Sequence, residues 1–526
     1  MILLKGESPI ATKPDSLSVD WRKRRTSVRR FFFLSLVKVN ATVAVAFILA
    51  KKRIGKLVCI VMSRLWYNYG FLKQSASNAG KDKNVDKAKQ YIVFLLVMAG
   101  CGGMLFDFGG TIINPAIPYL ESLKLYTTAE LSHLTSAVVM SAAIAGLVAG
   151  TLAEWIGRKK VMLLAAAIAG LACLPICLVP GYWSFYAGRT LQGIAAGLIG
   201  VVVPMYLAEC LDAKNRGKGA GIFQFMDVIG ILFCSLVGVA VVNVIGGPND
   251  PATTEAAKNV AWKTVFWSSA APAVIFFLGA LGLKESPVWL EKKAGKVKKE
   301  EKDTVSAPKD SLLQRKYILP FVLAVVILAC NQATGCNAIQ YFALKMFMDA
   351  GLGDAVANYA NVALWAVMLG MTAIACTLVD KKGRTFLLKI GTIGMVVSDV
   401  CAGFVFLAIK NGWMAPSLLS GWLAVAGVAG FIASFSIGPG VVVWLALSEL
   451  MPNRIRANGM AIGLFINMMV AYLISDVFLQ LVEKWGYAPV LFMLAGFAVL
   501  YFITAAFFLP ETKGRTLEEI EKMWEK

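Results

Sequence analysis

The feature that most constrains this chain is a series of twelve apolar runs between Lys89 and Pro510. Each run has about 20 residues, which is long enough to cross a hydrocarbon core about 30 Å thick. Backbone polar groups within that core must find partners inside the segment, so the runs must be helices. The alternating pattern of a membrane barrel is absent. The sequence therefore predicts an all-α membrane protein with twelve transmembrane helices.

The distribution of charge supports this prediction. Only 16% of the 526 residues are charged and 58% are hydrophobic, whereas soluble proteins have about 25% charged and about 45–50% apolar residues. The formal net charge is +20, but the basic residues gather in short loops between alternate helices, as at Arg158-Lys159-Lys160. This is the positive-inside pattern and not a nucleic-acid-binding surface. It predicts a multi-pass protein of the cell membrane with both ends of the twelve-helix body in the cytoplasm.

Residue types that serve catalysis or metal binding are scarce. The ten cysteines lie mostly within apolar runs, without metal-ligand spacing, and are interpreted as small packing residues. The single histidine, His133, lies near the outer end of the second predicted helix and is interpreted as a polar residue of the mouth or interface. One histidine cannot supply a His-based triad or a metal cluster. We therefore expect no enzyme activity, no cofactor and no metal site.

Residues 1–88 form a basic leader for which three interpretations remain open. Its apolar stretch at 31–50 could be a thirteenth spanning helix, but an arginine-rich segment would then lie outside, against the positive-inside pattern. It could also be an interfacial or signal-like helix, or belong to a leader upstream of the functional start. We favour a poorly ordered or interfacial leader.

The rest of the chain is a duplication. Two features recur at the same separation along the chain. Glu285 recurs as Glu511, and segment 154–158 recurs as segment 380–384. Parallel repeats of six helices around a midplane site are a transporter architecture. The predicted organisation is the leader at 1–88, a six-helix half at 89–290, a cytoplasmic linker at 291–315, a second, pseudo-symmetric six-helix half at 316–510, and a cytoplasmic tail at 511–526.

Charged pairs recur at matching depth in the two halves. Glu209 and Arg216 lie seven residues apart where the fourth predicted helix ends, and Glu449 and Arg456 repeat this spacing in the second half. A charge pair that is repeated where helices leave the membrane indicates a moving part. The sequence predicts a latch in which Glu209 pairs with Arg216 and Glu449 with Arg456.

Three ionisable residues lie inside predicted helices of the first half. Arg189 is costly in a membrane and is expected to face a polar interior. Asp107 and Asp227 are intramembrane carboxylates, and Asp227 shares a helix face with Gln224. Such carboxylates often act as proton relays. Asp107, Asp227 and Arg189 are therefore the candidates for proton coupling.

Several motifs, taken in order, carry a family resemblance. The chain from about residue 88 to residue 526 resembles the sugar porters of the major facilitator superfamily. The motifs that carry this resemblance are Pro204-x-Tyr206-x-x-Glu209 with Arg216-Gly217, Glu285-Ser286-Pro287, Gln332-x-x-Gly335-x-Asn337, Asp380-x-x-Gly383-Arg384, Gly438-Pro439-Gly440-x-x-x-Trp444 and the segment from Pro510 to Arg515.

The resemblance implies a sugar site at the midplane between the halves. Amide side chains both donate and accept hydrogen bonds, as sugar hydroxyls do, and an aromatic face suits the apolar face of a sugar ring. The substrate-binding positions that it implies are Gln224, Gln332, Asn337, Trp444 and Asn467. It also implies a cytoplasmic gate that pairs across the halves when the protein opens outward, made of Glu154, Arg158, Glu209, Arg216, Asp380, Arg384, Glu449 and Arg456.

The chain departs from the pattern of the family at several positions. Gly109 stands where proton-coupled members that resemble the bacterial xylose–proton symporter carry an aspartate, which leaves the coupling ion open. Met368 and Met468 replace an asparagine and an aromatic residue, and Val288 replaces an arginine. These departures leave the identity of the sugar open.

The predicted function is secondary active transport of a monosaccharide, a hexose or a pentose, by alternating access with proton symport. The partners expected are the sugar, a proton and the lipid bilayer, with no obligate protein partner. A facilitative uniporter and a carrier of a polyol or inositol remain alternatives. A non-transporting sugar sensor on the same fold is a further alternative.

Overall fold

The chain is helical throughout the part that the structure describes. This computed structural model describes residues 83–211, 213–294, 314–452, 455–513, 519–520 and 523–524. Within these ranges it leaves the side chains of residues 83–89, 213–218, 220, 380, 444–448 and 456–458 undescribed. Most of the predicted leader and most of the predicted linker therefore lie outside the described residues, and the domain boundaries stay predictions.

Within the described residues, twelve helical spans are long and apolar enough to cross a membrane, which confirms the predicted fold class. Six precede the undescribed segment at 295–313 and six follow it. The helices of the first half are α3 (Lys83–Thr111), α4 (Ile117–Ser122), α5 (Thr128–Ile156), α6 (Arg158–Leu171), α7 (Cys173–Leu178), α8 (Tyr182–Cys210), α9 (Ala213–Ile245), α10 (Glu255–Trp267), α11 (Ala270–Leu281) and α12 (Pro287–Lys293).

The second half repeats this pattern. Its helices are α13 (Arg315–Ala333), α14 (Cys336–Asp349), α15 (Asp354–Lys382), α16 (Arg384–Lys410), α17 (Leu418–Ile437), α18 (Pro439–Leu450), α19 (Arg456–Trp485) and α20 (Tyr487–Ile503), followed by the π-helical turn η2 (Thr504–Phe508).

Two spans of the second half are interrupted where sequence motifs place glycine. Gly335 separates α13 from α14 and adopts a left-handed conformation with φ of 80°, which a side chain would strain. Gly438 separates α17 from α18, and Pro439 then starts α18 because proline suits the first helical position. Interrupted membrane helices commonly border binding sites in transporters.

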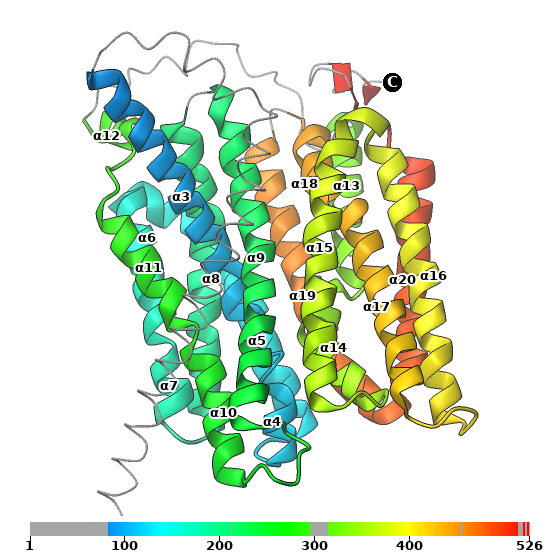
Figure 1. The fold of residues 1–526 in the computed structure, drawn as a ribbon. Helices are drawn as coiled ribbons and strands as arrows, with labels where there is room; N and C mark the ends of the chain where they lie inside the picture. Colours follow the sequence, from blue (N-terminus) through cyan, green and yellow to red (C-terminus); the bar gives the residue numbers. More distant parts are fainter. Residues whose placement is uncertain are drawn as a thin grey trace, which may run out of the picture. The chain divides into compact units, whose positions relative to one another are not determined.

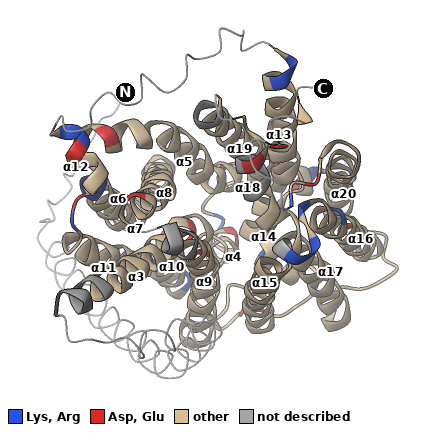
Figure 2. Ribbon diagram, turned by 90° about the horizontal axis from the view of Figure 1, so that it is seen from above, with Lys and Arg blue, Asp and Glu red and all other residues tan. Residues whose placement is uncertain are grey.

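The helices form two groups (Figures 1 and 2). Their largest contacts are those of α5 with α19 and of α9 with α15, and α4 also contacts α14. We call the end that carries the turns at Gly157 and Gly383 the motif end, which lies at the top in Figure 1. The other end, with α4, α7 and α10, is the opposite end.

The apolar core differs between the two ends. At the opposite end one continuous cluster includes residues of both halves, such as Trp262 and Phe342. Toward the motif end the described residues form two separate clusters. One belongs to the first half and contains Phe276, and the other belongs to the second half and contains Tyr501. The halves therefore share a core only at the opposite end.

Polar contacts between the halves follow the same asymmetry. All the hydrogen bonds between the halves for which both partners are described lie toward the opposite end. Examples are Asn114 Nδ2, which donates to the Gln340 carbonyl at 2.6 Å, and Lys345 Nζ, which lies 2.8 Å from Glu121 Oε2. The structure thus has the halves joined at the opposite end.

Close helix packing in the first half yields a stability prediction. A Cβ atom on Gly103 of α3 would overlap the carbonyl oxygen of Phe223 on α9. Gly103→Ala should lower the free energy of unfolding by about 1–3 kcal/mol, because overpacking forces the two backbones apart. Thermal unfolding in detergent measures this loss.

The matched control is Gly221→Ala on α9, where an added Cβ has no neighbour within 4 Å. This variant should be neutral or slightly stabilising, since alanine favours a helix over glycine by about 1 kcal/mol. Equal unfolding temperatures for the two variants would contradict the packing argument.

Candidate functional site

The turn between α5 and α6 at the motif end is held by a distant carboxylate. Gly157 has φ of 103°, and Glu285 Oε1 accepts hydrogen bonds from the backbone N–H groups of Arg158 at 2.9 Å and Lys159 at 3.1 Å. The same oxygen accepts a bond from Ser286 N at 3.0 Å. A carboxylate suits this place because the first N–H groups of a helix have no intrahelical partner and carry partial positive charge.

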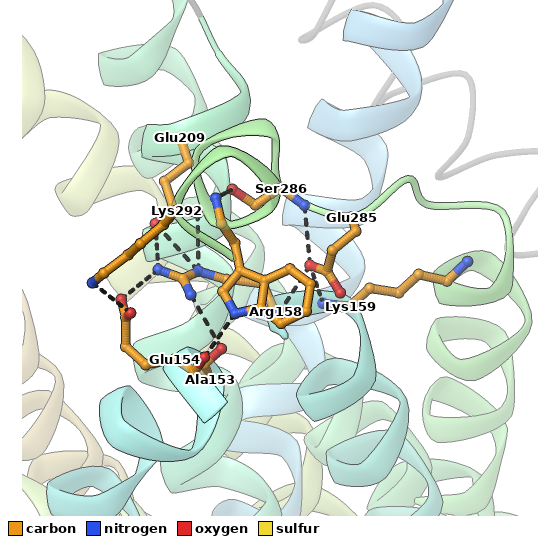
Figure 3. Close-up of polar contacts among 9 residues, drawn as sticks. Ala153, Glu154, Arg158, Lys159, Glu209, Glu285, Ser286 and Lys292 are labelled. Carbon is orange, nitrogen blue, oxygen red and sulfur yellow. Dashed lines mark hydrogen bonds and ion pairs between the residues drawn. The ribbon is translucent and has the colours of Figure 1, made fainter. Parts of the chain in front are cut away.

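The side chain of Arg158 is the centre of a buried ion network (Figure 3). Its Nε and Nη2 atoms donate to both oxygens of Glu209, at 2.8–3.2 Å. Nη2 also donates to Glu154 at 2.7 Å, and Nη1 to the Ala153 carbonyl at 3.1 Å. Only 3% of the Arg158 side chain is exposed. Lys292 of α12 binds the other Glu154 oxygen at 2.7 Å, so the network reaches α5, α6, α8 and α12.

The second half contains the same arrangement. Gly383 has φ of 94°, and the Glu511 carboxylate accepts bonds from Arg384 N and Thr385 N, both at 3.0 Å. Arg384 Nη2 donates to Glu449 Oε1 at 3.1 Å. The contact from Glu511 to Arg384 N spans 127 residues, as does the contact from Glu285 to Arg158 N. The sequence duplication is therefore a structural duplication of this site.

The electrostatics of Glu511 follow from these bonds. Burial acts to raise the pKa of its carboxyl, but hydrogen bonds from the N–H groups of Arg384, Lys513 and Thr385 outweigh burial and hold the pKa below its ordinary value. A carboxyl with a lowered pKa stabilises the fold above its unfolded pKa of about 4.3. This contribution is lost as the pH falls through the lower, folded pKa.

The described partners of two gate carboxylates are arginines at the starts of helices. Glu209 binds Arg158 and Glu449 binds Arg384. These described pairs lie within one half and not across the halves. The side chains of Arg216, Arg456 and Asp380 lie outside the described side chains. The pairing of Glu209 with Arg216 and of Glu449 with Arg456 stays a prediction.

In the second half, the structure brings together two of the predicted amides. Gln332 Nε2 donates to Asn467 Oδ1 at 3.2 Å, and Asn467 Nδ2 donates to the Leu328 carbonyl at 2.9 Å. Gln332 Oε1 is buried and has no hydrogen-bond partner. Asn337 is half-buried at the start of α14, just beyond the helix interruption. The side chain of Trp444 is not among the described side chains.

In the first half, the predicted amide lies beside a carboxylate. Gln224 is exposed, and its Nε2 donates to Asp227 Oδ2 at 3.1 Å. Asp227 is buried, and its Oδ1 has no hydrogen-bond partner. Asp107 lies close enough to Asp227 for their charges to interact. A Cβ atom added to Gly110 would lie 3.5 Å from Asp107 Oδ1 and 3.5 Å from the hydroxyl oxygen of Tyr341 in the second half.

Arg189 is fully buried, as expected, but its described partners include no carboxylate. Its guanidinium donates to the carbonyls of Gly109 at 2.6 Å, Gly110 at 3.0 Å and Leu134 at 3.0 Å. It also donates to Gln192 Oε1 at 2.7 Å. Arg189 therefore joins α3, α5 and α8.

Sequence reasoning left several residues of these sites unassigned. Gln192 orients Arg189, and Tyr341 approaches Asp107 from the other half. Asn331 donates to the Pro439 carbonyl at 3.3 Å and so ties the two interrupted spans together. Glu285 and Glu511 were recognised only as motif residues, although their equal separation from segments 154–158 and 380–384 was a usable signal.

Twelve spans in two duplicated halves, with interrupted helices and buried amides, define a membrane carrier of the major facilitator fold. The sequence model of the family described as "Sugar (and other) transporter" matches residues 58–524. The chain belongs to this sugar porter family, and it is a transporter and not an enzyme.

Known proteins resemble the chain over most of its length. The Arabidopsis thaliana "Sugar transporter ERD6-like 8" is 30% identical over 478 residues, which cover 84% of this chain and 94% of that protein. The "Glucose transport protein" of Synechocystis sp. is 29% identical over 458 residues, covering 82% and 97%. The crystal structure of a D-xylose-proton symporter matches with a TM-score of 0.68 at 25% identity, covering 81% of this chain and 100% of that one.

The ion network around Arg158 predicts unequal roles for its acidic and basic partners. Glu209→Gln should lower the free energy of unfolding by about 1–3 kcal/mol, because it removes the charge opposite a buried guanidinium. The midpoint of unfolding in detergent measures this effect.

Lys292→Gln is the control in the same network. The Lys292 side chain is 62% exposed, so its loss should cost less than about 1 kcal/mol. If Lys292→Gln destabilised the protein as much as Glu209→Gln, the buried network would not be the stabilising element.

Proposed function

We propose that this chain carries a monosaccharide, a hexose or a pentose, across the cell membrane by alternating access coupled to protons. The observation that carries the proposal is the asymmetry between its ends. The halves share one apolar core and their described hydrogen bonds at the opposite end, but have separate cores toward the motif end. Such an arrangement fits one state of a carrier whose halves separate alternately at each end.

The orientation follows from charge. Basic residues cluster in the loops of the motif end, for example Arg158 to Lys160 and Lys381 to Arg384. The positive-inside rule places that end, and with it both ends of the twelve-helix body, in the cytoplasm. The structure then corresponds to a carrier that is closed to the outside.

The amides supply the chemistry that a sugar needs. Gln332 has a buried carbonyl oxygen without a partner, and leaving such a group unpaired costs about 1–3 kcal/mol. A sugar hydroxyl could satisfy it, with Asn467 holding the other end of the Gln332 amide. In this proposal Asn337, Gln224 and Trp444 complete the site. The relatives named as transporters of glucose and of xylose with protons support a monosaccharide as substrate.

The networks of the motif end are assigned to the gate. In this structure Arg158 and Arg384 pair with acidic residues of their own halves. In the outward-open state these groups would exchange part of this pairing for contacts across the halves. Exposed ion pairs such as that of Lys292 with Glu154 are worth about 0–1 kcal/mol each, so an exchange of these exposed partners would not lock the carrier.

Asp107 and Asp227 are assigned to proton coupling. Asp227 has an unpartnered oxygen, and Asp107 lies beside Tyr341 of the other half, where a conformational change would alter its surroundings. A facilitative uniporter is the alternative mechanism. A carrier of a polyol or inositol is the alternative in substrate, and a sugar sensor that does not transport is less well supported.

Transport in a host that lacks its own sugar carriers tests the proposal. Uptake of glucose, xylose, arabinose and myo-inositol is measured with and without an uncoupler. A monosaccharide should accumulate, and Gln332→Ala should reduce its uptake by at least about tenfold, the effect of losing about 1.4 kcal/mol of binding.

Gln314→Ala, at an exposed glutamine before α13, is the control and should transport normally. Normal uptake by Gln332→Ala at equal membrane abundance would remove Gln332 from the site. Preference for myo-inositol, or the absence of any transport, would sink the monosaccharide proposal.

Proton coupling is tested by Asp107→Asn and Asp227→Asn. Each should abolish accumulation against a gradient while leaving sugar exchange at equal pH largely intact, because an amide cannot release a proton. Asp399→Asn is the control, since Asp399 is also buried but lies on α16 in the second half. Accumulation that survives both substitutions, or that is unaffected by an uncoupler in the wild type, would favour the uniporter.

A further inference from the structure

The only histidine of the chain bridges the two halves at the opposite end. His133 on α5 places Nδ1 2.7 Å from Asp476 Oδ1 on α19. The Ser136 hydroxyl, one helical turn further along α5, donates to the same oxygen at 2.6 Å. A carboxylate only accepts hydrogen bonds, so Nδ1 carries a proton in this contact. Protonation of the imidazole therefore adds the second proton at Nε2 without breaking the bond.

The position of the pair allows the charge of His133 to change the strength of the contact between α5 and α19. The His133 side chain is 45% exposed, so it can exchange protons, whereas that of Asp476 is only 15% exposed. The neutral imidazole already donates to a carboxylate, and protonation adds a coulombic attraction between the two opposite charges. Histidine is the side chain whose ordinary pKa, about 6.5, falls in the range where external pH varies. The contact between α5 and α19 thus strengthens as His133 gains its charge.

The other titratable groups near the pair are three tyrosines and Glu130. Tyr182 and Tyr186 lie on α8 and Tyr472 lies on α19, and phenols stay neutral until about pH 10. Glu130 precedes His133 by one turn and is bound to the N-terminus of α5 through Thr127.

A second contact between the halves at the opposite end, the ion pair of Glu121 with Lys345, responds to acidification in the opposite direction. Burial raises the pKa of Glu121, although Lys345 of the other half opposes this rise. Protonation of Glu121 would weaken its ion pair with Lys345 and loosen the opposite end. The sign of any pH effect therefore distinguishes His133 from Glu121.

We propose that His133, Ser136 and Asp476 form a pH-sensitive latch between the halves at the opposite end. The protonated imidazole holds this end closed, and when it loses its proton the latch weakens and the halves separate more readily there. The inference rests on the proposed alternating access, in which this end faces outside and must open to admit the substrate. External acidification then slows outward opening, independently of the protons that drive transport.

The latch is tested by measuring the separation of the halves directly. Donor and acceptor dyes are attached through unnatural amino acids at Lys124 and Asn411, two exposed positions at the opposite end of the two halves. Single-molecule energy transfer on the full chain in nanodiscs, without sugar and with equal pH throughout, gives the ratio of closed to open molecules. Between pH 7.5 and pH 5.5 this ratio should rise about two- to fivefold, the range expected for a partly exposed ion pair.

Four variants assign the effect. His133→Gln and Asp476→Asn should both abolish the rise, because each removes one charge while keeping a hydrogen-bonding side chain. Glu130→Gln is the matched control, since glutamine still caps α5, and it should respond to pH like the wild type. Glu121→Gln removes the opposing contribution and should leave the rise intact or enlarge it.

Two results would overturn the latch. One is a rise that persists in His133→Gln, and the other is a ratio that stays constant with pH in both the wild type and Glu121→Gln. Because the measurement needs no substrate, a failure of the latch is distinguishable from a failure of sugar transport. Halves that open at this end with no dependence on His133 would exclude the latch and leave alternating access standing.

Discussion

Each half of this transporter depends on a carboxylate that binds the start of a helix far away in sequence. Glu285 holds the N–H groups that open α6, and Glu511 does the same for α16. The glycine before each helix is required because a Cβ there would overlap the carboxylate. This contact ties the end of the sixth span of each half to the start of its third. The arginine that begins the helix then extends the tie to the fourth span, through Glu209 or Glu449.

The consequence is a division between rigid and changeable contacts. Within a half, a buried guanidinium with several partners is costly to unpair, so the ends of the helices move together. Between the halves, several of the described bonds at the opposite end involve exposed groups, such as Asn249, which donates to Asp354. Contacts of that kind contribute about 1 kcal/mol or less each. Motion is therefore easier between the halves than within them, as a carrier requires.

The sequence was most informative where a single physical constraint acts. The bilayer demands long apolar helices, so twelve spans were readable, and the duplicated motifs located the turns at Gly157 and Gly383. Partners were less predictable, because the bond from Arg158 to Glu209 joins residues that are 51 positions apart in sequence. His133 was expected only as a polar residue near the mouth. Its partner Asp476 lies 343 residues away, and no local pattern indicates such a pair.

The buried charge of Arg189 is bound by backbone carbonyls at the end of a helix. The last carbonyls of a helix lack intrahelical partners and carry partial negative charge. Helix α3 ends at Thr111, and the carbonyls of Gly109 and Gly110 bind the guanidinium of Arg189. With glycine in place of an aspartate, the arginine caps α3 through its backbone and is satisfied without a carboxylate. Protonation of Asp107 therefore breaks no described ion pair with Arg189, and Asp227, whose charge interacts with that of Asp107, is the neighbour through which coupling would act.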